Sequence, residues 1–234
     1  MVVPTFRIRR HPDVRGLDLS PLSRRSLLGL GAGAAVLSAL PAWAQTAPAA
    51  PAAAIDIKAA TAEIVYGDPK AKVTVVEYAS LACSHCADFE INMLPTFKKE
   101  FIDPGEVKLV FRDFPMNAPG LRAHMLMRCA GGAKGLALKT AIMKSQHSWL
   151  NQDYLKHLSQ IARLSGMSQE QFDACTSNKQ LEDFLIKSQY TASQEKQINS
   201  TPTFIVDDNY VVMGAKLDEL TEAVQKAGAK RKAS

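Results

Sequence analysis

Hydrophobic positions follow two different patterns of spacing between residues 73 and 101. The run Val73–Ala79 is apolar and rich in valine, a composition typical of a buried β-strand. After Cys86 the apolar positions recur in steps of three and four, at Phe89, Met93, Phe97 and Phe101. This spacing places them on one face of a helix of about four turns. The pattern therefore predicts a strand that passes directly into a helix.

The remaining patterns predict a mixed α/β protein in which most helices lie between two groups of strands. Further strands are expected near 63–66, 107–111, 203–206 and 210–213, the last two joined by a turn at Asp207-Asp208-Asn209. Helical periodicity begins after Pro119, and helices are expected at 136–146, 151–164, 168–175, 179–197 and 217–226. About seventy helical residues are more than a crossover between strands requires. We therefore expect a helical subdomain inserted into one α/β domain.

Two cysteines lie where the predicted strand meets the predicted helix, in the sequence Cys83-Ser84-His85-Cys86. The N-terminus of a helix carries a partial positive charge, which favours a thiolate at Cys83. Two cysteines separated by two residues can also close a small disulfide and open it again. A zinc site is the alternative, but it needs a fourth ligand that no second cysteine or histidine pair supplies. We interpret the segment as a dithiol redox site with no metal and no cofactor.

Three further features accompany this cysteine pair: Glu77 six residues upstream, Pro95 within the helix, and Thr201-Pro202 directly before a later strand. With them, residues from about 60 to 228 resemble the DsbA family of exported thiol:disulfide oxidoreductases. The resemblance implies an α/β thioredoxin-like fold with an inserted α-helical subdomain. It also implies an enzyme that performs dithiol–disulfide exchange. One departure is Ser84, where many members of the family carry proline.

The first 44 residues have the composition of a leader. Ser23-Arg24-Arg25-Ser26-Leu27-Leu28 matches a twin-arginine signal, and an apolar run from Leu27 to Leu40 follows. Ala42-Trp43-Ala44 supplies small residues for cleavage after Ala44. An uncleaved anchor and an ordinary Sec signal are the alternatives. Export would place the protein in the periplasm, an oxidising compartment for its cysteines.

The resemblance and the composition together divide the chain into consecutive parts. We expect a signal peptide at 1–44, an Ala/Pro-rich linker at 45–59, a thioredoxin-like domain at 60–114 and 198–228, an inserted helical subdomain at 115–197, and a frayed basic tail at 229–234.

Charge gives no indication of a nucleic-acid partner. The chain has a net charge of +5, but the leader contains six arginines and two acidic residues, so the remainder has a net charge of +1. The basic balance therefore belongs to the leader. The expected partners are reduced exported proteins as substrates and a membrane protein that reoxidises the Cys83-Cys86 pair. We recognise no dimerisation segment and expect a monomer.

Position within the predicted elements assigns a role to each residue of the redox site. Cys83 lies at the helix start and is expected to be the nucleophile, whereas Cys86, one turn further in, resolves the mixed disulfide. His85 would favour the Cys83 thiolate by its charge or a hydrogen bond, unless it is only a solvated loop residue. Glu77 shares a strand face with two valines, so burial favours its protonated form. The resemblance makes Glu77 the proton acceptor for Cys86; an edge-strand acid that reaches water is the alternative.

Two further pairs complete the expected site. Thr201-Pro202 resembles the cis-proline that faces the C-x-x-C loop in this fold, where it would expose the Thr201 backbone to a substrate strand. An ordinary trans proline at the start of a strand is the alternative. Cys129 and Cys175 both fall in the helical insertion, and export favours a structural disulfide between them over two buried free cysteines.

These features predict a periplasmic oxidase that donates its Cys83-Cys86 disulfide to exported proteins. A thiol reductase or disulfide isomerase built on the same site is the second hypothesis. A holdase-like protein that binds unfolded chains, with incidental cysteines, is the third. A pair oxidises its clients when its own reduced form is stabilised, and the helix N-terminus stabilises reduced Cys83 as a thiolate.

Overall fold

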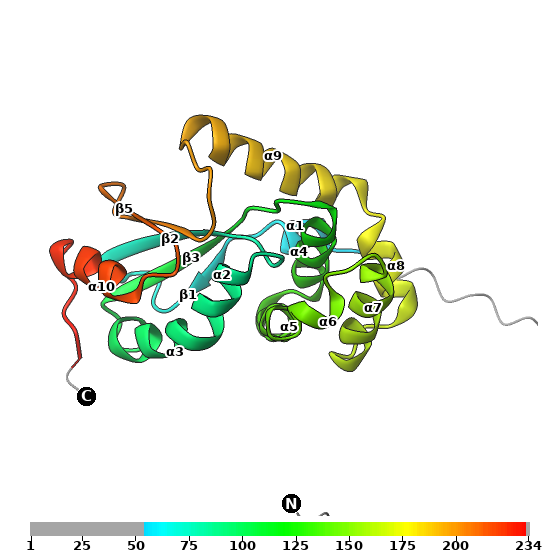
Figure 1. The fold of residues 1–234 in the computed structure, drawn as a ribbon, viewed down its shortest axis with the longest axis horizontal. Helices are drawn as coiled ribbons and strands as arrows, with labels where there is room; N and C mark the ends of the chain where they lie inside the picture. Colours follow the sequence, from blue (N-terminus) through cyan, green and yellow to red (C-terminus); the bar gives the residue numbers. More distant parts are fainter. Residues whose placement is uncertain (1–53, 233–234) are drawn as a thin grey trace, which may run out of the picture. The chain divides into compact units, whose positions relative to one another are not determined.

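A five-stranded sheet organises residues 54–232, the part of the chain that the computed structural model describes (Figure 1). Its strands follow the order β1-β3-β2-β4-β5, and their bounds are β1 Ile64–Tyr66, β2 Val73–Ala79, β3 Val107–Asp113, β4 Thr203–Val206 and β5 Tyr210–Met213. β2 and β3 are parallel, whereas the other neighbouring pairs are antiparallel. The predicted thioredoxin-like α/β fold with a helical insertion is confirmed.

β2 lies at the centre of the sheet because both of its edges are paired. It pairs with β3 along its whole length and with β4 along residues 75–78. Its alternate residues Val73, Val75, Glu77 and Ala79 are buried, while those between are half buried. The predicted alternation of faces is therefore confirmed, and Glu77 lies inside the protein rather than at an edge.

A continuous helical segment follows the cysteine pair, but it is less regular than its sequence predicts. It consists of α2 Ser84–Asp88, the π-helical turn η1 Phe89–Met93, α3 Leu94–Phe97 and the π-helical turn η2 Lys98–Ile102. Pro95 offers no N–H to the preceding turn and its ring crowds that turn, which a wider π turn accommodates. The extra residue shifts the buried face, so Leu94 is buried where Met93 was expected.

Six helices form the insertion between β3 and β4. They are α4 Ala118–Ala130, α5 Gly132–Lys144, α6 Gln146–Trp149, α7 Tyr154–Leu164, α8 Gln169–Thr176 and α9 Lys179–Glu195. α5 begins four residues before its expected start because Gly131 and Gly132 form a tight turn with positive φ values of 60° and 47°. Gly135 then packs so closely on α4 that a Cβ atom there would lie 2.5 Å from the carbonyl oxygen of Met127.

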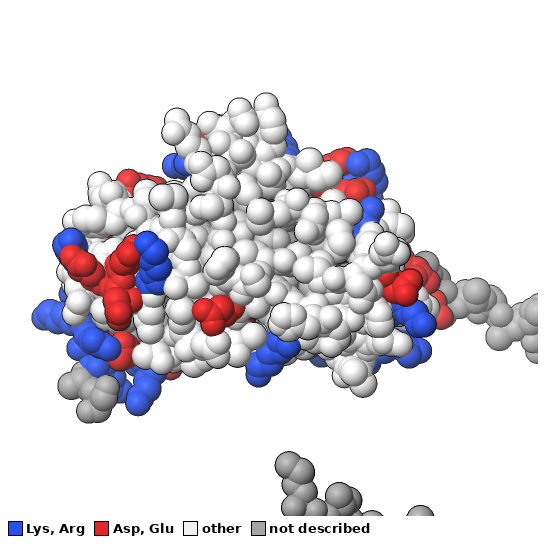
Figure 2. All heavy atoms as spheres, in the orientation of Figure 1, with Lys and Arg blue, Asp and Glu red and all other residues white. Residues whose placement is uncertain are grey.

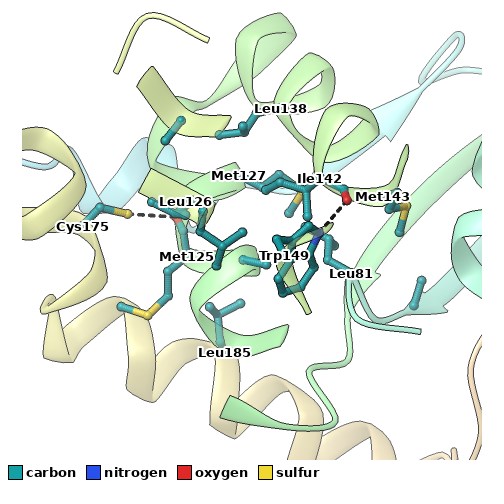
Figure 3. Close-up of a cluster of buried hydrophobic side chains, with 14 of the residues drawn as sticks. Leu81, Met125, Leu126, Met127, Leu138, Ile142, Met143, Trp149, Cys175 and Leu185 are labelled. Atoms are coloured by element: carbon teal, nitrogen blue, oxygen red, sulfur yellow. Dashed lines mark hydrogen bonds between the residues drawn. The ribbon is translucent and has the colours of Figure 1, made fainter. Parts of the chain in front are cut away.

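The two largest hydrophobic cores of the described residues lie on different parts of the fold. One lies between the sheet, the 84–102 helical segment and the last helix, α10 Leu217–Lys226. The other lies between the insertion and one face of the sheet, and in it Trp149, Met125 and Leu126 pack with Leu81 from the loop after β2 (Figure 3). Leu81 and Cys86 therefore pack in the same core as the helices of the insertion, so the redox loop contacts the insertion directly.

The two ends of the described region include parts of the expected linker and tail. Residues 57–59 belong to a short helix, α1 Ile57–Ala60, whose N-cap Asp56 accepts a hydrogen bond from the N–H of Ala59 at 3.0 Å. At the other end, Ala229 is buried and Arg231 pairs with Glu100 at 2.7 Å. Apolar packing at Ala229 and the ion pair of Arg231 thus attach this part of the expected tail to the domain, although residues 230–232 are exposed.

The expected leader and its cleavage site lie outside the described residues. Within residues 54–232, no helix combines the length and the apolar character needed to cross a membrane.

Candidate active site

Cys83 and Cys86 occupy different environments although only two residues separate them. Cys83 is the N-cap of α2 and is half buried, whereas Cys86 lies one turn into the helix and is fully buried. Both are free thiols in this structure. The Cys83 Sγ donates a hydrogen bond to the carbonyl oxygen of Thr201 at 3.3 Å, and the N–H of Ser80 contacts the Cys86 Sγ at 3.5 Å.

These environments move the two thiol pKa values in opposite directions. A hydrogen bond from the Cys86 thiol, supported by Thr201 and by the N–H groups of Cys86 and His85, lowers the pKa of Cys83 to about 5 although partial burial opposes it. Burial, together with the hydrogen bond and charge of Cys83, raises the pKa of Cys86 far above its usual range. At neutral pH the reduced site therefore consists of a Cys83 thiolate and a protonated Cys86 thiol.

His85 lies in the first turn of α2, between the two cysteines. Its imidazole is exposed and makes no hydrogen bond with any residue of the described region, while its backbone N–H supports the Cys83 thiolate. The contribution described in the structure therefore comes from the helix N-terminus, and the expected effect of the ring stays a prediction.

Glu77 is a buried carboxyl group in the central strand. It is 1% exposed, and its Oε2 atom has no hydrogen-bond partner within residues 54–232. Burial raises the pKa of Glu77 to about 7; the nearby Lys139 charge opposes this shift and the Glu90 charge adds to it. Glu77 makes no hydrogen bond to Cys86 among the described contacts, so its expected role as proton acceptor stays a prediction.

A buried ion pair near Glu77 was not foreseen from the sequence. The Lys139 Nζ lies 2.7 Å from the Glu90 Oε2, and the Thr140 hydroxyl donates to the Glu90 Oε1 at 2.7 Å. Burial alone would lower the pKa of Lys139, but the groups of Tyr66, Glu90 and Glu77 raise it on balance. Lys139 therefore carries a charge inside the protein, where it partly offsets the two buried glutamates.

A second buried network was also missed. Asp113 at the end of β3 bonds to the His124 Nδ1 at 2.6 Å and to the Arg128 guanidinium, both on α4. Burial would raise the pKa of Asp113, but these two partners lower it to about 2. The Nε2 atom of His124 accepts a hydrogen bond from the N–H of Leu81 at 3.2 Å, two residues before Cys83.

Thr201, the residue before Pro202, contacts Cys83 of the redox pair. The Thr201–Pro202 peptide bond is cis, and Thr201 is 8% exposed. The Thr201 hydroxyl points to the sulfur of Met116 at 3.2 Å, and Met116 itself is 56% exposed. An exposed apolar side chain thus stands next to the redox site.

Cys129 and Cys175 are joined by a disulfide in the structure. The bond connects α4 to α8 with a Cα–Cα distance of 6.2 Å and lies wholly within the insertion. The two cysteine pairs are therefore in different states, one linked and the other reduced.

The variant Glu77→Gln is expected to make the free energy of unfolding less dependent on pH. The carboxyl has a pKa of about 7 when folded and about 4.3 when unfolded, so the folded state holds an extra proton between these values. The extra proton stabilises the folded state. This stabilisation is fully present below about pH 4 and is lost as the pH rises through 7, which lowers the free energy of unfolding by up to about 3 kcal/mol. Urea unfolding at pH 4 and pH 8 measures it.

Glutamine cannot ionise, so Glu77→Gln should gain stability relative to the parent mainly at pH 8. Glu63→Gln is the control, since Glu63 is an exposed carboxylate paired with Arg112. Equal pH dependence in the parent and Glu77→Gln would show that the carboxyl does not titrate in this range.

Comparisons with known proteins place this site in a family. A family model described as Thioredoxin matches residues 59–226. A relative from Rickettsia conorii, named "Putative protein-disulfide oxidoreductase RC0029", is 32% identical over 78% of this chain. The chain spans 66% of that protein's length and 62% of the length of a similar Rickettsia typhi protein.

Solved structures give the same picture at the level of the fold and the family. The crystal structure of alpha-DsbA1 from Wolbachia pipientis is 32% identical, with a TM-score of 0.65, over 70% of this chain and 90% of that one. BdbD from Bacillus subtilis, at 22% identity and a TM-score of 0.61, covers 70% of this chain and 92% of its own and shares the fold. This chain belongs to the DsbA family of thioredoxin-fold proteins.

Proposed function

We propose that this protein is a thiol–disulfide oxidoreductase that donates its Cys83–Cys86 disulfide to exported proteins. The observation that carries the proposal is the pKa of Cys83, which its hydrogen bonds lower to about 5. A stabilised thiolate stabilises the reduced pair, and a pair whose reduced form is stable gives up its disulfide readily. The names of the relatives, which are protein-disulfide oxidoreductases and DsbA proteins, support the same chemistry.

The reaction needs two exchange steps. A client thiolate attacks the Cys83 Sγ of the oxidised pair, which forms a mixed disulfide and releases the Cys86 sulfur as a thiolate that takes up a proton. A second client thiolate then attacks the client sulfur of the mixed disulfide. The client leaves with a new disulfide, Cys83 leaves as a stable thiolate, and two electrons have passed from the client to the protein.

Glu77 is the proposed proton store for this cycle. With a pKa raised to about 7 by burial, Glu77 is poised to give a proton to Cys86 when the pair is reduced and to take it back on reoxidation. Glu77 is expected from the sequence to accept the proton of Cys86, and the proposed role adds the return of that proton when the pair is reduced. A membrane protein is the proposed oxidant that returns Cys83 and Cys86 to the disulfide.

Client binding is proposed to use the surface around Thr201. The Thr201 carbonyl lies 3.3 Å from the reactive sulfur, where an extended client segment could pair with the backbone. Met116 adds an exposed apolar contact. On the face shown in Figure 2, charged side chains gather toward the two ends, and the middle, over α2 and α4, is mostly uncharged. Such a surface suits unfolded clients of varied sequence.

The cellular setting is proposed from the leader. A twin-arginine signal at 1–44, cleaved after Ala44, would bring a monomeric domain from residue 60 onward to the periplasm. The helical subdomain at 115–197 would be an insertion within that domain. The Cys129–Cys175 disulfide supports an oxidising compartment, because such bonds persist there.

The test supplies a reduced, unfolded client to the oxidised protein. We expect rapid disulfide transfer and a reduction potential well above the value of about −270 mV known for thioredoxin. Cys83→Ser is the control and should transfer nothing. A potential near that of thioredoxin, together with efficient reduction of insulin, would move the protein to the reductase or isomerase class. Client binding without redox activity in the parent would favour a holdase.

A further inference from the structure

The loop between β2 and α2 is held by two buried side chains of the helical insertion. The His124 Nε2 accepts a hydrogen bond from the N–H of Leu81 at 3.2 Å. The Gln146 Nε2 donates to the carbonyl oxygens of Leu81 at 2.8 Å and of Cys83 at 3.0 Å. His124 is 0% exposed and Gln146 is 7% exposed, so neither bond competes with bulk water. The backbone on both sides of Ala82 is thus tied to the insertion.

The side chain of Leu81 adds a third attachment. It is fully buried in the core of the insertion and lies near Trp149 of α6 (Figure 3). Gln146 belongs to the same short helix. α6 therefore contacts the loop through packing and through two hydrogen bonds.

The network around His124 fixes which of its nitrogens carries the proton. A backbone N–H can only donate, so the Nε2 atom that faces Leu81 must be unprotonated. The proton of the neutral ring then lies on Nδ1 and is donated to Asp113 at 2.6 Å. Asp113 is in turn paired with Arg128, whose NH1 donates to the carbonyls of Ala60 and Ala62. His124 is therefore held as a hydrogen-bond acceptor aimed at the loop.

The orientation of Gln146 follows from the same reasoning. Both loop atoms that it faces are carbonyl oxygens, which can only accept, so its amide nitrogen must point to them. Loss of this amide would leave two carbonyl groups without that donor, a costly change in a buried place.

The loop in turn fixes both sulfur atoms. The N–H of Cys83 donates to the carbonyl oxygen of Ser80 at 3.1 Å, and the N–H of Ser80 contacts the Cys86 Sγ at 3.5 Å. Apart from Thr201, the groups that stabilise the Cys83 thiolate belong to α2, so they act fully only while the loop keeps the Cys83 Sγ in front of them.

We propose that His124 and Gln146 are positioning residues through which the helical insertion sets the reactivity of Cys83. Neither residue reaches the reacting sulfur; each acts through the backbone of residues 81–83. The inference deepens the proposed function and rests on it only in so far as Cys83 is the reactive thiol.

The test measures the ionisation of Cys83 and the equilibrium of the Cys83-Cys86 pair with glutathione in two variants. Gln146→Leu keeps a side chain of similar size but removes both donors, and His124→Phe removes the acceptor while it keeps a flat ring. For each we expect the apparent pKa of Cys83 to rise by about one unit and the pair to become about tenfold less oxidising, the factor typical of one buried hydrogen bond.

Leu158→Ala is the matched control. Leu158 lies on α7 and is fully buried in the same hydrophobic core as Leu81, but it takes part in none of the three backbone bonds of the loop. The variant leaves a cavity within the insertion, so it should lose stability without shifting the Cys83 titration. Equal shifts in Leu158→Ala and Gln146→Leu would overturn the inference, because the effect would then be general loosening of the insertion.

Two readouts separate this inference from the proposed function. If the parent exchanges with glutathione but does not oxidise clients, the proposed donor role fails while the Cys83 titration still tests His124 and Gln146. If Gln146→Leu is folded by circular dichroism and titrates as the parent does, the positioning role is refuted whatever the parent does to clients. Should His124→Phe fail to fold, Gln146→Leu alone decides.

Discussion

Replacing Cys86 by alanine is expected to leave the reduced protein covalently joined to clients that contain disulfides. Cys86→Ala removes the largest of the hydrogen bonds that lower the pKa of Cys83, but Thr201 and the backbone N–H groups of residues 85 and 86 still favour the thiolate, which attacks a client disulfide. In the parent, Cys86 then displaces the client sulfur in an intramolecular step. Without Cys86 only external thiols can do so, which should lengthen the life of the mixed disulfide roughly a hundredfold or more. Non-reducing electrophoresis measures the trapped complex.

Cys83→Ala is the matched control for this experiment. It leaves Cys86 as the remaining thiol of the pair, fully buried and with a pKa that burial raises far above its usual range. Such a thiol is a poor nucleophile at neutral pH, so little complex should form. If Cys83→Ala traps clients as well as Cys86→Ala does, the assignment of attacking and resolving cysteines is wrong.

Sequence patterns were sufficient for the parts of the fold that depend on local rules. Alternation in β2 placed Glu77 among buried residues, and the structure agrees. The turn between β4 and β5 was recognised from Asp207-Asp208-Asn209, and both aspartates adopt the positive φ values that this kind of hairpin requires. These features need only neighbouring residues, so one sequence contains the information.

The buried polar contacts could not be predicted because their partners are far apart in the chain. Gln146 and the loop residue Leu81 are 65 positions apart, and Lys139 and Glu90 are 49 positions apart. Within its own helix, Lys139 follows an apolar stretch and looks like a solvated residue. Only the packing of the insertion onto the sheet shows that it is buried beside a carboxylate. His124 is likewise a single polar residue on a predicted helix, and only the structure shows that its ring accepts a hydrogen bond from the N–H of Leu81.

Local context misled at one place and was insufficient at another. Met93 fits the helical spacing, but the π turn before Pro95 shifts the buried face to Leu94. His85 lies between the cysteines, and proximity in sequence suggested an interaction of its ring with Cys83. In the structure the ring is exposed and the backbone N–H of His85 supports the sulfur, so an effect of the ring on Cys83 stays a prediction. Spacing predicts which residues are near, but not which of their atoms meet.

The double variant Cys129→Ala/Cys175→Ala is expected to lose a large part of the stability of the fold. The disulfide connects α4 to α8 across a sequence separation of 46 residues. Closing a loop of this length restricts the unfolded chain, which in the chain-entropy model contributes about 4 kcal/mol to the free energy of unfolding. That is a substantial share of the stability of an ordinary domain. Urea unfolding of parent and variant measures the difference.

Two controls separate the covalent link from the packing of the cysteine side chains. Cys175 is fully buried and its Sγ lies 3.1 Å from the carbonyl oxygen of Met125, so alanine also leaves a small cavity there. Dithiothreitol should therefore destabilise the parent by most of the same amount, while it leaves the stability of the double variant unchanged. If the reductant acts equally on both proteins, the loss comes from elsewhere. If dithiothreitol reduces the Cys129–Cys175 disulfide of the parent without lowering its free energy of unfolding, the disulfide itself contributes little.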